Sequence, residues 1–225
     1  MELTLKQIKK DQRINTFIEH TDTYLKALGY NDHAHRHLKI VSDRARQVAK
    51  IIGLNKKDQE LAAISAWCHD MGNFMGRSQH HYWGAMLFSQ CYINQTDDYE
   101  SVTKIIKAIA SHDKDELKIV DKMTACVIIA DKSDVHRSRV LKKSIKSIKE
   151  DIHDRVNYAV TGNQLSVNKK SKIIMLSLTL DTKFTDMMDY FSIFIGRMNY
   201  CQKAADYLGY EFKLKNEIKG FITNF

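Results

Sequence analysis

Proline is absent from this 225-residue sequence, and cysteine occurs only four times. Without proline, turns and helix ends must be marked by Gly, Asn and Asp or by a change in hydrophobic period. The cysteines Cys68, Cys91, Cys126 and Cys201 are scattered and form no Cys-x-x-Cys pair, which argues against a zinc ribbon and against a secreted disulfide framework. We therefore expect reduced, mostly buried thiols.

Long hydrophobic runs are also missing. The N-terminal stretch MELTLKQIKKDQR is charged and lacks the apolar segment of a signal peptide, and no stretch approaches the ~20 apolar residues that a membrane span needs. We therefore expect a cytoplasmic protein without a membrane partner. The formal net charge of +8 would attract anionic partners such as nucleotides or nucleic acid.

Up to about residue 150, apolar residues recur at spacings of three and four, which predicts amphipathic helices. One such stripe ends before Gly53, a residue type typical of helix C-caps, and Asn55 can cap the next helix. The sequence favours helices around the following stripes: Val41 to Ile52, Leu61 to Ala66, Gly84 to Cys91, Val102 to Ile109 and Val120 to Val135.

After residue 150 the period changes to two. Val156, Tyr158 and Val160 alternate with less apolar residues before Gly162-Asn163, which predicts a hairpin. A strand over 174–180, a helix over 188–208 and a strand from Tyr210 are expected next. We therefore predict a mainly α protein: a helical domain over residues 1–150 and a small antiparallel α+β subdomain over 151–225. This appendage could serve as a lid or as a homo-oligomer surface, and its Met and aromatic stripe over 187–198 is expected to pack internally.

Four polar residues occupy positions that their predicted helices mark as buried: His37, His69, Asp70 and Asp131. A single buried histidine is usually hydrogen-bonded in the core, and a buried carboxylate without a partner is very costly. One divalent ion of Mn, Fe, Co, Zn or Mg would satisfy all four side chains. His69 and Asp70 follow the end of a predicted helix, where the helix dipole favours a cation.

The order of these residues, with His37 in HLKIV, His69-Asp70 in WCHDMGN and Asp131 in IIADKSD, resembles the H…HD…D signature of HD-superfamily phosphohydrolases. The resemblance covers roughly residues 30–140. It implies an all-helical core that holds a metal through these four residues and hydrolyses phosphate esters, often nucleotides, with metal-activated water.

Two further histidines extend the resemblance. The segment HHYWGAMLF is similar to the H-x-x-x-G-A segment of the family. The match assigns the motif histidine to His80, with His81 as the alternative. The segment IASHD places His112 at the end of an apolar stripe. In two-metal members, such as bacterial dinucleoside tetraphosphate hydrolases, histidines in these places bind the second ion. The resemblance then implies one or two divalent ions, with Asp70 as the bridge between two.

One position departs from the family pattern. Many relatives read H-D-x-G-K, whereas Asn73 stands here in place of the lysine, which commonly binds phosphate. Arg77 and Lys132 can supply the missing charge, because phosphoryl transfer requires cations at the non-bridging oxygens; the alternative for each is a solvated surface cation. His33 and His35 precede His37 and are expected on the surface.

The sequence therefore predicts an enzyme that hydrolyses a small phosphate ester, such as a nucleotide, with Asp70, Arg77 and Lys132 as catalytic residues. Two alternatives are a nucleotide-sensing module without turnover and a di-iron oxygenase. The basic stretch from Arg137 to Lys149 can attract nucleic acid, but it also fits the solvated face of one amphipathic helix. No recognition motif supports a nucleic-acid partner.

Overall fold

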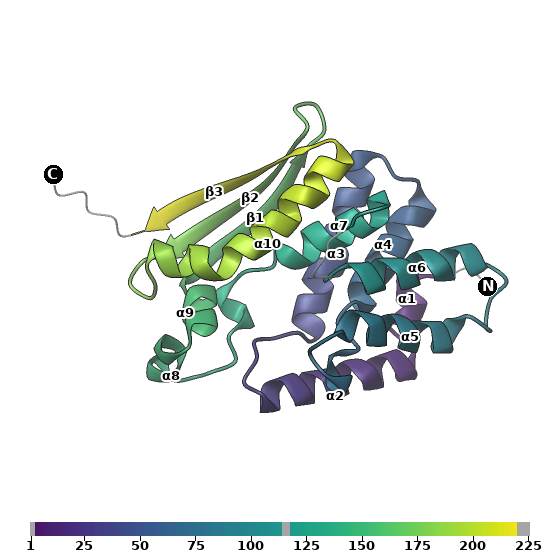
Figure 1. The fold of residues 1–225 in the computed structure, drawn as a ribbon, viewed down its shortest axis with the longest axis horizontal. Coiled ribbons are helices and arrows are strands. Elements are labelled where there is room, and N and C mark those ends of the chain that lie inside the picture. The colour runs from purple at the N-terminus through teal and green to yellow at the C-terminus, as the bar shows by residue number, and fades with distance from the viewer. Residues whose placement is uncertain (1–2, 114–117, 220–225) are drawn as a thin grey trace. The chain divides into compact units, whose positions relative to one another are not determined.

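The computed structural model describes residues 3–113 and 118–219, which separate into two compact units, 1–131 and 132–225 (Figure 1). The division falls after Asp131, whereas the change of hydrophobic period suggested residue 150. The described residues are mainly helical, as the sequence periodicity predicts. None of the helices in this part of the chain is long and apolar enough to cross a membrane.

The first unit is built from helices. Its elements are α1 (Leu5–Ile8), α2 (Gln12–Ala27), α3 (His35–Ile52), α4 (Lys56–Cys68), the short 3-10 helix η1 (Asn73–Met75), α5 (His80–Tyr92), α6 (Tyr99–Ser111) and α7 (Lys122–Lys132). Helix α3 packs along α4, and α6 contacts both α4 and α5. The expected helical stripes in this unit are therefore confirmed, except that α7 is shorter than the stripe from Val120 to Val135.

Local signals set the ends of these helices. Gly53 ends α3 in the left-handed conformation with a φ of 93°, which glycine adopts without steric cost. The side chain of Asn55 accepts a hydrogen bond from the Asp58 amide and so caps α4. The side chain of Asp98 caps α6 in the same way through the Ser101 amide. All four cysteines are buried and free, as expected.

The second unit consists of one sheet with helices. Its elements are the 3-10 helix η2 (Arg137–Arg139), α8 (Ile145–Glu150), α9 (Ile152–Ala159), β1 (Val160–Asn168), β2 (Ile173–Asp181), α10 (Met187–Leu208) and β3 (Glu211–Lys219). The strand order is β1-β2-β3. Helix α10 lies across the sheet in Figure 1, and its Tyr190 and Phe194 share a buried core with Leu176, Leu178 and Leu180 of β2.

The hairpin predicted at Gly162-Asn163 is wrong. Val156 and Tyr158 lie in α9, because the side chain of Asp151 accepts hydrogen bonds from the amides of His153 and Asp154 and starts a helix there. Gly162 lies inside β1 beside a bulge. The actual turn follows Asn168, whose side chain accepts from the amides of Lys170 and Ser171.

The expectation of a wholly antiparallel sheet is also wrong. Strand β1 pairs antiparallel with β2, but β3 pairs parallel with β2, and Leu176 lies opposite Leu214. The cause is α10, because a helix between two strands of one sheet returns the chain to the same end and makes the strands parallel. The helix and its ending at Gly209 are as predicted.

Two other expectations for the second unit need correction. The basic stretch is not one helix, since it comprises η2, an irregular segment and α8, and Arg139 within it is only 2% exposed. The apolar stripe of α10 does not pack throughout. Met188, Phe191 and Ile195 are 71%, 42% and 58% exposed.

Two glycines allow a close backbone approach in the first unit. A Cβ atom on Gly72 would overlap the backbone nitrogen of Gly84 and the carbonyl oxygen of His80. The segment that follows α4 therefore passes directly against the first turns of α5. This contact brings the residues after α4 next to His80.

We predict that Gly72→Ala destabilises the first unit by roughly 1–3 kcal/mol, the usual cost of overpacking, because backbone cannot move aside as a flexible side chain can. Urea denaturation followed by far-UV circular dichroism measures this change. The control is Gly196→Ala in α10, where an added Cβ meets nothing within 4 Å; it should be stabilising by about 0.5–1 kcal/mol. Equal stability of wild type and Gly72→Ala would contradict the close approach.

Candidate metal centre

Five elements of the first unit bring histidines and aspartates together. His37 lies in the first turn of α3, and His80 is the first residue of α5. His69 and His112 are the C-cap residues of α4 and α6. Asp70 follows His69, and Asp131 lies in the last turn of α7. All six side chains belong to residues that are at most 5% exposed.

The first group of side chains contains His37, His69, Asp70 and Asp131. The Nε2 atoms of His37 and His69 are 3.4 Å apart. Each lies 3.5 Å from Oδ1 of Asp131. Oδ2 of Asp70 lies 3.6 Å from His37 Nε2 and 3.3 Å from His69 Nε2. His37, His69 and Asp131 thus form one group that could hold an ion, and Oδ2 of Asp70 lies beside its two imidazoles.

The second group lies on the other oxygen of the same carboxylate. His80 and His112 direct their Nε2 atoms at each other across 3.2 Å. Oδ1 of Asp70 is 3.3 Å from His80 Nε2 and 4.0 Å from His112 Nε2. His81 is buried as well, but its ring centre lies 6.2 Å from that of His112, so His80 is the histidine that faces this group.

The other nitrogen of each of three imidazoles contacts a backbone carbonyl. His69 Nδ1 lies 2.8 Å from the oxygen of Ala66, His80 Nδ1 3.0 Å from that of Arg77 and His112 Nδ1 2.7 Å from that of Ile109. A carbonyl oxygen only accepts, so Nδ1 donates and the Nε2 atom of the neutral ring carries a lone pair. Such second hydrogen bonds orient metal-ligating histidines.

Facing lone pairs repel unless a proton or a metal ion lies between them. Bonds of about 2.1 Å from one metal to ligands at tetrahedral or octahedral angles separate neighbouring ligand atoms by roughly 3.0–3.4 Å. The separations in the first group, 3.3 to 3.6 Å, are close to this spacing. The donor set therefore fits a buried divalent ion.

The charges of the site favour a cation as well. Burial opposes protonation of His69, but the charges of Asp70 and Asp131 outweigh it and raise its pKa to about 10. Burial likewise opposes ionisation of Asp70, yet His69 and His33 hold its pKa well below the usual range. The C-terminal ends of α4, α6 and α7 add the negative ends of three helix dipoles. A field that holds a proton on His69 also attracts a metal ion.

Sequence reasoning missed two members of this cluster. His33, expected on the surface, is only 7% exposed, and its Nδ1 lies 2.7 Å from Oδ2 of Asp70. Oδ2 of Asp113 lies 3.7 Å from His80 Nε2. The available signal for His33 was its position four residues before His37, because residues four apart share one face of a helix. This signal applies only if the helix includes His33, whereas α3 begins at His35. His35 is exposed, as expected.

Arg77 and Lys132, the two predicted cations, differ in their surroundings. Arg77 is half-buried and donates from Nη1 to Oδ1 of Asn73 across 2.9 Å. Asn73 in turn donates to Oδ1 of Asp70 across 2.9 Å, so Arg77 is linked to the cluster. Lys132, the first residue of the second unit, is only 6% exposed, and its Nζ lies 5.4 Å from the centre of the Tyr200 ring of the same unit. The alternative of a solvated surface cation is therefore wrong for Lys132.

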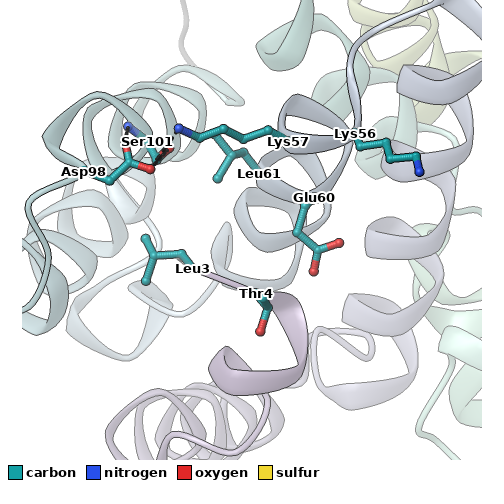
Figure 2. A pocket seen from close by; sticks show the side chains of 8 residues that line it. All are labelled: Leu3, Thr4, Lys56, Lys57, Glu60, Leu61, Asp98 and Ser101. Carbon is teal, nitrogen blue, oxygen red and sulfur yellow. Dashed lines mark hydrogen bonds and ion pairs between the residues drawn. The ribbon is translucent and has the colours of Figure 1, made fainter. Parts of the chain in front are cut away.

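A cavity elsewhere in the first unit does not involve these residues. It has a volume of about 300 Å³, and Figure 2 shows its lining side chains: Leu3, Thr4, Lys56, Lys57, Glu60, Leu61, Asp98 and Ser101. Lys57 pairs with Asp98 at 2.9 Å, and Glu60 pairs with Arg46 at 2.6 Å. These charges are matched within the chain, so we assign no ligand to this cavity.

Comparison with known proteins adds little to this geometry. No family model matches the chain. A protein of Methanocaldococcus jannaschii, named MJ1020 and described as uncharacterized, is 25% identical over 155 residues. The alignment covers 59% of this chain and 60% of that relative, so the chain matches less than two thirds of the length of the relative. The name of the relative assigns no activity to either protein.

We predict that Asp131→Ala lowers the metal content of the purified protein by at least one equivalent, because His37 and His69 then lack the carboxylate that neutralises an ion between them. Metal analysis by mass spectrometry, after reconstitution with Mn²⁺ or Zn²⁺, measures the loss. The control is Asp43→Ala on α3, which removes a carboxylate that is 55% exposed. Full occupancy in Asp131→Ala would exclude this residue as a ligand.

Proposed function

We propose that this protein is a metal-dependent phosphohydrolase of the HD type that acts on a small phosphate ester such as a nucleotide. The observation that carries the proposal is the set of three imidazoles, His69, His80 and His112, whose Nδ1 atoms donate to backbone carbonyls. Their Nε2 lone pairs point at buried carboxylates and at other imidazoles. This arrangement suits metal ligation.

We further propose two ions. His37, His69 and Asp131 would hold one ion with Oδ2 of Asp70, and His80 and His112 would hold the other with Oδ1. Asp113 can add a second carboxylate to the latter group. Because each group contains two imidazoles, Fe, Mn, Co or Zn fits better than Mg, which prefers oxygen ligands.

When bound, such ions supply a water molecule of lowered pKa and neutralise charge on phosphoryl oxygens. The chain contributes a further cation at Arg77. The bond to Asn73 uses one of the five N–H donors of its guanidinium, and the remaining donors suit the non-bridging oxygens of a phosphate. We favour Arg77 over Lys132 for this role, because hydrogen bonds through Asn73 connect Arg77 to Asp70.

Two other functions fit the same ligands. A di-iron oxygenase uses histidines and carboxylates to activate dioxygen, and a nucleotide sensor binds its ligand without turnover. Arg77, which is connected to Asp70 through Asn73, favours an anionic substrate. This supports hydrolysis or nucleotide sensing over oxygen chemistry.

Reconstitution separates these functions. The protein, loaded in turn with Mn²⁺, Fe²⁺, Co²⁺ or Zn²⁺, is incubated with a panel of nucleotides, phosphomonoesters and phosphodiesters. We expect release of phosphate or cleavage of a phosphodiester with at least one ion. Tight nucleotide binding without turnover under every ion would favour the sensor, and oxygen consumption by the iron form without hydrolysis would favour the oxygenase.

The number of ions is tested by the double variant His80→Ala/His112→Ala. We predict that it retains one equivalent of Mn²⁺ and loses the other, together with hydrolysis, because only the group around Oδ1 of Asp70 is removed. Isothermal titration with Mn²⁺ gives the stoichiometry. Unchanged stoichiometry with lost activity would mean that the two histidines contact the substrate phosphate and that one ion suffices.

A further inference from the structure

We propose that His33 and Asn73 position the carboxylate of Asp70 from opposite sides, so that one oxygen faces each metal position. This inference rests on the proposed two-metal function. Neither residue belongs to the H…HD…D pattern, and both act through Asp70, so both are positioning residues. The structure places a polar contact from a separate residue on each of the two oxygens.

His33 holds the first oxygen. Its Nδ1 lies 2.7 Å from Oδ2 of Asp70. An ionised carboxylate only accepts hydrogen bonds, so His33 donates. This contact is shorter than the 3.3 and 3.6 Å that separate Oδ2 from His69 and His37. It therefore holds Oδ2 in place beside the imidazoles of His37 and His69.

Asn73 holds the second oxygen. It is completely buried, and its Nδ2 donates both to Oδ1 of Asp70 across 2.9 Å and to the backbone oxygen of Asp70 across 2.8 Å. Its Oδ1 accepts from Arg77. The two Asp70 oxygens can only accept hydrogen bonds, and the Arg77 guanidinium can only donate. The amide group of Asn73 therefore satisfies all three contacts in a single orientation. A lysine at this position would lack the acceptor for Arg77.

These two contacts prevent a specific alternative. The terminal torsion of an aspartate side chain is soft, so a carboxylate without such contacts can turn both oxygens toward one ion and leave the other ion without a bridge. Hydrogen bonds on both oxygens fix the plane of the carboxylate. We infer that they keep Asp70 bridging while substrate binds and product leaves.

The two contacts should affect different ions. In the His80→Ala/His112→Ala background, which keeps only the ion beside Oδ2, His33→Leu should weaken Mn²⁺ binding by about 10–100-fold, the usual effect of removing a residue that orients a metal ligand. In the same background Asn73→Leu should leave the Mn²⁺ affinity unchanged or higher, because no ion binds beside Oδ1 of Asp70 in that variant. With all ligands intact, Asn73→Leu should instead weaken the second Mn²⁺ by about 10–100-fold.

Two controls separate orientation from other effects. Arg77→Ala removes the partner of the Asn73 oxygen but leaves the donor to Asp70, so it should retain both ions. His33→Asn places an amide nitrogen near the position of Nδ1 and should restore most of the affinity lost in His33→Leu. Far-UV circular dichroism checks that each variant is folded.

Electron paramagnetic resonance gives a readout that is independent of activity. Two Mn²⁺ ions bridged by a carboxylate are magnetically coupled, so wild type should show a coupled spectrum, and His33→Leu and Asn73→Leu should shift it toward isolated Mn²⁺. Binding of fewer than two ions by wild type would overturn the two-metal function and this inference with it. Two coupled ions in wild type, with unchanged affinity and coupling in both variants, would overturn the positioning role alone.

Discussion

The hydrogen bond from a histidine to a backbone carbonyl is the interaction on which the centre of this protein depends. His69 and His112 each bond to the carbonyl three residues earlier, at the end of the helix that carries them, and His80 bonds to the carbonyl of Arg77. Each bond uses the only N–H of a neutral imidazole. The other nitrogens must then meet one another and the carboxylates as acceptors, which is stable only around positive charge. These bonds therefore leave a cluster that a proton or a metal ion could stabilise.

The surrounding fold serves this requirement in two ways. Helices α4, α6 and α7 end at the cluster, so their dipoles add to the negative field of Asp70 and Asp131. The glycine contact between Gly72 and the first turns of α5 brings His80 to the oxygen of Asp70 that faces away from His37 and His69. One carboxylate can therefore serve two groups of imidazoles that lie on different helices.

Much of this arrangement could be predicted from the sequence, because the helical period of the first unit is strong and its caps are local. The burial of His37, His69 and Asp131 followed from their places on apolar stripes. His33 could not be found in this way, since it lies before α3 and reaches the site by the path of a loop. The sequence marked Asn73 only as a replacement for the lysine of the family pattern. Its role depends on three hydrogen bonds, two to Asp70 and one from Arg77, which hydrophobic periodicity does not predict.

The second unit was harder to predict because alternation alone does not determine pairing. A hydrophobic period of two correctly predicted the strand β2. The same period also occurs in α9, which is helical because Asp151 caps its N-terminus. The direction of β3 depends on the crossover through α10. The order strand, long helix, strand in the sequence was the available signal that β2 and β3 pair in parallel.

That crossover has a consequence for how the second unit forms. Strand β2 is central, yet its two partners differ in distance along the chain: β1 joins it through a tight turn, while β3 arrives only after the whole of α10. Contacts between distant segments form late, since closing the longer loop costs more entropy. During synthesis, one edge of β2 stays open until β3 emerges, and α10 can cover the buried face of the hairpin before that. A circular permutant that begins between β2 and β3 would let β3 be made before β2.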